Sequence, residues 1–117
     1  MRHQKSGKKL GRTRDPRKAL LRSLATSFVL NNGKIKTTKT KAQAVRPIIE
    51  KYITASKKNE LAVKRNLEKY FYTGKAVKKL LEEIGPKYKD RKGGYTRIIK
   101  IGPRSGDQAQ MVSLELV

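Results

Sequence analysis

The chain has 117 residues, a common length for one folded domain, and hydrophobic residues make up 36% of it. Thirty Lys and Arg against nine Asp and Glu give a formal net charge of +21, which is typical of a protein that binds nucleic acid. The absence of Cys excludes disulfides, thiol catalysis and cysteine-ligated zinc, and no apolar run approaches the roughly 20 residues of a membrane-spanning helix.

The chain begins with a strongly basic segment, MRHQKSGKKLGRTR, which contains six Lys or Arg and no acid. No apolar region follows it, so it does not have the pattern of a signal peptide, and neither end carries a lipidation motif. We therefore expect a cytosolic protein. Residues 1–14 can bury little, so we expect an extension that orders when it binds an anion; a solvated tail is the alternative.

The first predicted helix follows this extension. Asp15 is a good N-cap, and Pro16 suits the first helical position because its missing N–H costs nothing there. Asn31-Asn32-Gly33 predicts a left-handed end to the helix. Between these signals runs an apolar stripe at helical spacing, consisting of Leu20, Leu21, Leu24, Ala25 and Phe28.

A strand and a second helix come next. The alternation of KIKTT, residues 34–38, predicts a short strand with its two lysines on one side. Thr40 and Gln43 have the spacing of a capping box that opens the second helix, and Pro47 is expected to kink this helix or loosen its first turn. The apolar stripe of this helix consists of Val45, Ile48, Ile49, Tyr52 and Ile53.

Two further helices are predicted in the middle of the chain. The third is capped near Asn59 within KKNELAVKRNLEKYFYTG. The fourth runs from about Lys75 to Ile84, and Gly85-Pro86 follows it as a stop signal. The stripe of the third helix consists of Leu61, Val63, Leu67, Tyr70 and Phe71.

Two strands are predicted at the end of the chain, in YTRIIKI and in MVSLELV, where Val112, Leu114 and Leu116 share one face. GPRSGDQAQ is too long for a two-residue hairpin, so we expect an extended loop between them. The order α-β-α-α-α-β-β favours an α+β fold. We expect residues 15–117 to form one globular domain, with a small mixed sheet of about three strands covered on one face by about four helices.

The sequence offers no catalytic constellation. The only histidine, His3, lies in the basic extension, and Glu82-Glu83 diverge around a helix. Asp90 and Asp107 fit turn positions, or partners of a neighbouring arginine, better than a Mg²⁺ site. Gly93-Gly94 lead into a strand, so no helix N-terminus is present to complete a phosphate loop. We therefore expect no enzyme activity, no metal and no cofactor.

Lysine and arginine occur in most predicted elements, whereas a DNA-reading module usually concentrates its basic residues on one helix or arm. This spread favours a protein surrounded by the phosphates of folded RNA, recognised through shape, phosphates and 2′-hydroxyls. Base stacking is not expected, because the aromatic residues are few and most lie on apolar stripes. Tyr95 is the exception, and both RNA contact and core packing remain open for it.

Four segments carry a family resemblance: MRHQKSGKKLGRT, RKALLRSLATSFV, KIKTTKTKAQAVRPIIEKYIT and DRKGGYTRIIKIGPRSGDQAQM. Through them the chain resembles the bacterial large-subunit ribosomal protein L17 family along its whole length. The resemblance implies a non-catalytic structural constituent of the large subunit in the cytoplasmic ribosome. It also implies that the partners are 23S ribosomal RNA and neighbouring large-subunit proteins, with no membrane and no small-molecule substrate.

The candidate RNA-binding residues lie in the basic extension, on the first helix and around the glycine-containing turns. Arginine can fork onto phosphate oxygens, and glycine permits close approach. The alternative function is a free histone-like protein that binds DNA through the same charge. The candidate residues are Arg2, His3, Lys5, Lys8, Lys9, Arg12, Arg14, Arg17, Lys18, Arg22, Arg91, Lys92, Gly93, Gly94, Tyr95, Arg97 and Arg104.

Overall fold

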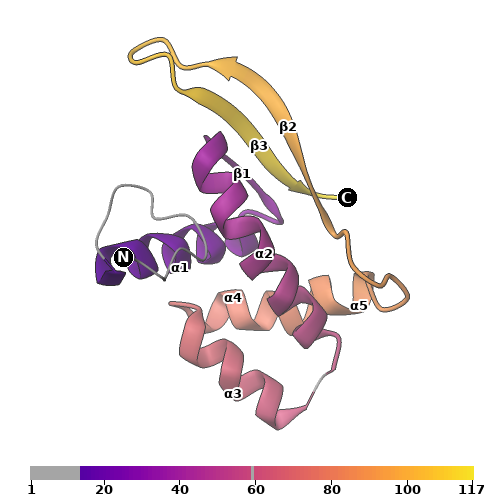
Figure 1. Ribbon diagram of the computed structural model, residues 1–117. Coiled ribbons are helices and arrows are strands. Elements are labelled where there is room, and N and C mark those ends of the chain that lie inside the picture. The colour runs from indigo at the N-terminus through magenta and orange to yellow at the C-terminus, as the bar shows by residue number, and fades with distance from the viewer. Residues whose placement is uncertain (1–13, 59) are drawn as a thin grey trace, which may run out of the picture.

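The computed structural model describes residues 14–58 and 60–117, so the basic extension and the predicted cap Asn59 lie outside the described residues. Helices cover one face of a small sheet (Figure 1), and the α+β prediction is confirmed. The elements are α1 (Arg14–Leu30), β1 (Lys34–Thr38), α2 (Lys39–Ser56), α3 (Leu61–Tyr70), α4 (Gly74–Lys79), the π-helical turn η1 (Leu80–Ile84), α5 (Gly85–Lys87), β2 (Thr96–Pro103) and β3 (Gln110–Leu116). Their order confirms the predicted one, since α4, η1 and α5 follow one another without a break.

The sheet has the strand order β1-β3-β2, and the central strand is antiparallel to both neighbours. The expectation of a mixed sheet was therefore wrong: β1 and β2 point the same way, but β3 separates them. Leu114 of β3 pairs with Ile35 and with Ile98 on the face toward the helices. Glu115, the next residue along, lies on the opposite face.

The core lies between this inner face and the helices. Half of the predicted stripe residues of α1 and α2 are buried in it, and the other five are half-buried: Leu20, Leu21, Leu24, Ile48 and Tyr52. Leu61, at the start of α3, is 63% exposed. The largest fully enclosed side chains are Tyr95, Phe28, Ile49, Ile53, Leu67, Leu80 and Leu114.

The two ends of the β1 segment show how the chain turns without long loops. The left-handed end of α1 is confirmed: Asn32 and Gly33 have φ angles of 59° and 80°, and the Gly33 N–H donates to the Phe28 carbonyl at 2.8 Å. At the other end β1 runs directly into α2. Thr38, the last strand residue, therefore caps α2 by accepting a hydrogen bond from the Lys41 N–H.

Two predicted helix starts were consequently wrong. The capping box of Thr40 and Gln43 lies inside α2, because β1 continues to the residue that caps the helix. Asp15 lies in the first turn of α1 rather than at its cap, since the helix begins one residue earlier. Pro47 lies within α2, which is a single helix from Lys39 to Ser56.

The Gly85-Pro86 stop signal does not end the fourth helix. The Gly85 N–H donates to the carbonyl of Leu80, which forms a wide π-helical turn, and Pro86 then occupies the first turn of α5, where it needs no N–H. A Cβ at Gly85 would lie 2.6 Å from the carbonyl oxygen of Ser56. Glycine at this position therefore permits close packing against the end of α2.

The predicted loop between β2 and β3 is shorter than expected and consists of residues 104–109 at the tip of a hairpin. The strands extend to Pro103 and from Gln110, and the Arg104 N–H closes the turn by donating to the Ala109 carbonyl at 2.7 Å. A bulge occurs between Lys100 and Gly102. The hairpin extends past the helices, with its tip far from α5 (Figure 1).

Candidate nucleic-acid interface

The loop between α5 and β2 presents Arg91 and Lys92 to solvent from an anchored base. The Lys57 ammonium of α2 donates to the Arg91 carbonyl and to the Tyr95 hydroxyl, the latter at 3.0 Å. At the far end of the loop the Val117 N–H donates to the Tyr95 carbonyl at 2.8 Å. Both sides of the loop are thus fixed to the folded body, while its two basic side chains remain exposed.

Two glycines form the tip of this loop. Gly93 and Gly94 have φ angles of 122° and 62°, in the left-handed region that favours glycine. A Cβ at either position would meet nothing within 4 Å. The turn therefore needs glycine for its backbone conformation, and the space outside it is open to a ligand.

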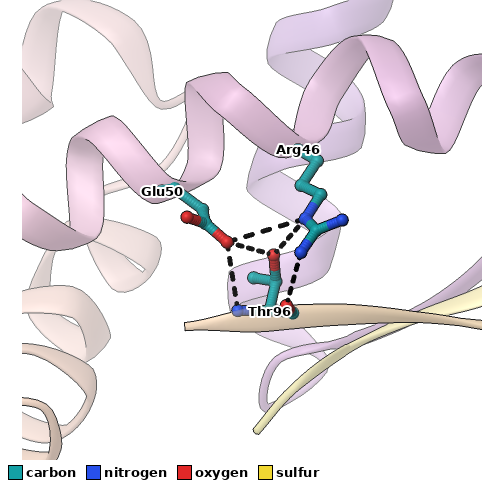
Figure 2. A network of polar contacts seen from close by, with 3 residues as sticks. All are labelled: Arg46, Glu50 and Thr96. Carbon is teal, nitrogen blue, oxygen red and sulfur yellow. Dashed lines mark hydrogen bonds and ion pairs between the residues drawn. The ribbon is translucent and has the colours of Figure 1, made fainter. Parts of the chain in front are cut away.

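The start of β2 is held by a polar network on α2 (Figure 2). The Glu50 carboxylate accepts hydrogen bonds from the Thr96 N–H at 3.2 Å and from the Thr96 hydroxyl at 2.6 Å. Arg46 donates to the Thr96 hydroxyl at 3.1 Å and to its carbonyl at 3.0 Å. Sequence reasoning missed this network, although the i,i+4 spacing of Arg46 and Glu50 was a visible signal for their pairing.

Tyr95 is 1% exposed, so core packing is the alternative that the structure supports. Its ring lies against Tyr88 with a centroid separation of 5.3 Å, and its hydroxyl shares a 3.0 Å hydrogen bond with Thr54. Burial raises the pKa of Tyr95, but the hydrogen bonds with Lys57 and Thr54 outweigh it and bring the pKa below its usual value. The expected RNA contact of this side chain is therefore corrected to a core role.

Arg104 stands at the tip of the β2–β3 hairpin in a two-point pair with Asp107. The distances are 3.0 Å from Nε to Oδ1 and 2.6 Å from Nη2 to Oδ2. The hydrogen bond from Arg104, joined by one from the Ala109 N–H, holds the pKa of Asp107 far below its usual range. The interpretation of Asp107 as the partner of a neighbouring arginine is confirmed.

The basic residues of the loop and of the hairpin do not form one cluster. β2 lies between them, and its eight residues separate the two groups by roughly 23 Å at about 3.3 Å per residue. Arg97, near the first group, lies on the outer face of the sheet, 3.5 Å from Glu115, which Lys34 also approaches at 3.5 Å. The predicted residues therefore lie in separate places along β2 rather than in one cluster.

Arg22 on α1 is committed to internal contacts. Its Nε donates to the Tyr70 carbonyl at 2.7 Å, its Nη2 donates to the Lys69 carbonyl at 3.0 Å, and its guanidinium lies 4.5 Å from the centre of the Tyr72 ring. These contacts tie α1 to the end of α3, so Arg22 has a structural role, and its RNA contact stays a prediction. Arg17 and Lys18, one turn earlier, have no such contact among those the structure describes and reach solvent.

The remaining predicted residues belong to the basic extension. Arg14 opens α1 through its backbone, but its side chain is outside the described part of the structure. The RNA-binding roles of the residues in the extension therefore stay predictions. The residues that lie wholly outside the described ranges are Arg2, His3, Lys5, Lys8, Lys9 and Arg12.

Many further cations lie on the helices, and sequence reasoning did not single them out. Within residues 14–58 and 60–117, ion pairs engage only Lys34, Arg46, Arg97 and Arg104. The same ranges contain no group of three metal-ligating side chains and no helix long and apolar enough to cross a membrane. The further exposed cations outside these pairs include Lys36, Lys39, Lys51, Lys58, Lys64, Arg65, Lys69, Lys75, Lys78, Lys87, Lys89 and Lys100.

Comparison with known proteins gives one consistent result. The sequence profile of the family described as Ribosomal protein L17 matches residues 20–117. Large ribosomal subunit protein bL17 of Clostridium botulinum strain Hall is 53% identical over 110 residues, which cover 94% of this chain and 96% of that protein. The bL17 protein of Thermoanaerobacter sp. strain X514 is also 53% identical, over 94% of this chain and 97% of its own length.

Proposed function

The chain belongs to the ribosomal protein L17 family, and on that premise we propose that it binds 23S ribosomal RNA as a structural constituent of the large ribosomal subunit. Membership of this family makes it a ribosomal component and not an enzyme. Its partners are then ribosomal RNA and neighbouring large-subunit proteins, in the cytoplasmic ribosome.

The observation that carries the proposal is the large excess of exposed cations. The chain has thirty Lys and Arg but only nine Asp and Glu. In the described structure these cations lie on the helices, on the sheet and in the loops. Each phosphate neutralised by one of them releases condensed counterions, which favours binding. A surface charged in this way suits a site that is enclosed by folded RNA.

The loop of Arg91 and Lys92 supplies a preorganised contact. Because Lys57 and Tyr95 already fix its base, binding loses little backbone entropy there. The open space beyond Gly93 and Gly94 lets a phosphate approach the backbone N–H groups of the turn. Arg104, at the other end of β2, adds a second phosphate contact, already oriented by Asp107.

The basic extension completes the proposed interface. Residues 1–14 contain six cations and no acid, and we propose that they order on the RNA during assembly of the subunit. A net charge of +21 opposes a compact state through self-repulsion. Phosphate binding reduces this repulsion, so the RNA stabilises the folded protein as well as being bound by it.

The test compares deproteinised 23S rRNA with duplex DNA at equal phosphate concentration, using the full chain and filter binding over a series of salt concentrations. A preference for the rRNA of roughly tenfold or more at physiological salt supports the proposal. Attraction between the cations and phosphate acts equally on both polymers, so a preference must come from recognition of the RNA itself. Equal affinity for the two would contradict it and would favour a histone-like DNA-binding protein.

A further inference from the structure

Two half-exposed tyrosines, one on α2 and one on α3, form the wall of a surface hollow. The rings of Tyr52 and Tyr70 are stacked, with centroids 4.6 Å apart and planes inclined by 27°. Phe71 packs edge-on against both rings at 5.4 and 5.3 Å. Arg22 fixes the backbone at Tyr70 through its hydrogen bond to the carbonyl. The aromatic wall is therefore rigid before any ligand arrives.

The tyrosine hollow has a volume of about 390 Å³ and is lined by Lys51, Tyr52, Ala55, Asn66, Lys69 and Tyr70. A second hollow of about 370 Å³ shares Lys69 and Tyr70, and Lys18 and Arg22 are added at its rim. No acidic side chain lines either hollow. Cations thus surround an aromatic surface, an arrangement that complements an anion with a flat apolar part.

We propose that the tyrosine hollow receives an unpaired nucleotide of the bound RNA, with its base against the tyrosines and its phosphates near Lys51 and Lys69. This inference rests on the proposed function and adds to it one site for a nucleotide outside the RNA helices. Base-on-aromatic stacking combined with lysine or arginine at the backbone is the usual chemistry of single-strand recognition. Asn66 supplies an amide that can bond to a base edge.

The chemistry of the wall agrees with this assignment. Burial raises the pKa of Tyr70 to about 12, so its hydroxyl stays protonated and can donate a hydrogen bond. One face of each tyrosine stacks on the other ring, and the Lys51 ammonium and the Arg22 guanidinium lie 5.9 and 5.6 Å from the centres of the Tyr52 and Tyr70 rings. An acidic peptide would satisfy these cations but offers no flat group for the aromatic surface, which therefore favours RNA over a protein partner.

The test fills the hollow without changing any charge. Ala55→Leu places a larger side chain inside it, and Ala62→Leu, an exposed position on α3 outside both hollows, is the matched control. Fluorescence anisotropy of the full chain measures affinity for a labelled single-stranded RNA and for its blunt duplex. We expect Ala55→Leu to weaken single-strand binding roughly tenfold and to leave duplex binding unchanged, because one stacked base is lost.

Equal affinities of the two variants for the single strand would overturn the inference while leaving the proposed function intact. Failure of the wild-type chain to bind either RNA would instead contradict the proposed function. An oligoglutamate of equal charge serves as a competitor. If it displaces the single strand from the wild-type chain but not from Ala55→Leu, the inference is overturned and the hollow binds an acidic protein partner instead.

A second measurement does not depend on any substitution. Ultraviolet crosslinking of the wild-type chain to the same single-stranded RNA, followed by mass spectrometry of the peptides, identifies the tyrosines that contact bases. We expect adducts on Tyr52 or Tyr70. Tyrosine adducts confined to Tyr72, which lies outside both hollows, would contradict the proposed site.

Discussion

At the scale of single residues, side chains of one type have a structural role at one position and are exposed at another, according to their neighbours. Tyr95 follows two glycines in a basic loop, yet it is enclosed, whereas Tyr70 lies on a predicted apolar stripe and reaches the surface. Arg22 holds two backbone carbonyls, whereas Arg91 extends into solvent. Charge and aromatic character alone therefore do not separate RNA-facing residues from structural ones.

Glu50 gives a direct test of the network that holds β2. Glu50→Ala leaves the Thr96 N–H without its carboxylate partner, and we expect the free energy of unfolding to fall by roughly 1–3 kcal/mol. Urea denaturation of the full chain measures the change. Glu68→Ala, at an exposed position on α3, should change stability by less than about 0.5 kcal/mol. Equal losses in the two variants would show that the network contributes nothing.

Glu115 predicts a pH dependence with a defined sign. The hydrogen bond from Ser113 lowers the pKa of Glu115, and Lys34 and Arg97 lower it further. A carboxylate with a lowered pKa in the folded state stabilises the protein above its ordinary pKa of 4.5, and this stabilisation is lost as the pH falls through the lowered value. Melting temperatures should therefore fall less on acidification in Glu115→Gln than in wild type. An identical fall in both would contradict this assignment.

At the scale of elements, the chain relies on close packing where local sequence signals favour a break. Gly85-Pro86 has the local pattern of a helix stop, but the chain continues through it because η1 supplies a π-turn and Gly85 lies against Ser56. β1 and α2 follow one another with no loop, and one threonine serves both. These two joints fix the helices relative to the sheet and so position the loop before β2.

The two glycines of the fourth helical segment provide a matched pair of substitutions. A Cβ at Gly85 would lie 2.6 Å from one backbone oxygen and 2.9 Å from another, whereas a Cβ at Gly74 would meet nothing within 4 Å. We expect Gly85→Ala to destabilise the protein by roughly 1–3 kcal/mol. Gly74→Ala should leave stability unchanged or raise it by up to about 1 kcal/mol. Thermal unfolding followed by circular dichroism measures both, and equal melting temperatures would contradict the packing role.

Local patterns were sufficient to predict the elements themselves. α1 carries a full apolar stripe and a left-handed end, and β1 alternates cleanly, so both were predicted from neighbouring residues. The hairpin between β2 and β3 and the passage through Gly85-Pro86 depend on pairing and contact between distant residues. Local patterns do not contain that information.

The same division applies to the candidate site. The exposed loop cations Arg91 and Lys92 were found because the basic pair precedes two glycines in the sequence. The structural contacts of Tyr95 and Arg22 were not predicted because their partners, Thr54 and Tyr70, are 41 and 48 residues away. The consecutive aromatics Tyr70, Phe71 and Tyr72 were a usable signal that was missed, since three successive residues cannot all lie on one helix face.

At the scale of the whole molecule, charge dominates. The formal net charge of +21 on 117 residues already counts all nine acids, so ion pairs within the protein cannot reduce it. Such a molecule is repelled by itself and attracted by polyanions, so under the proposed function we expect folding and RNA binding to be coupled through phosphate. Because the loop cations and the hairpin cations lie apart, we expect the RNA contacts to be spread along the molecule rather than gathered in one cleft.

The basic extension predicts a change in salt dependence. Removing residues 1–14 deletes six cations, of which we expect about five to contact phosphate. The slope of log affinity against log salt for 23S rRNA should then become less steep by roughly 3.5 to 4.5. Filter binding over a salt series measures the slope for the full and the shortened chain. An unchanged slope would show that the extension is a solvated tail.

Sedimentation of a cell lysate at moderate salt tests whether the chain is an RNA-bound constituent of the large ribosomal subunit. Fractions of a density gradient are probed for the protein and for 23S rRNA. We expect the protein to sediment with the large ribosomal particle and to move to lighter fractions after ribonuclease treatment. If it runs free, or with chromosomal DNA, it is not a constituent of the large subunit.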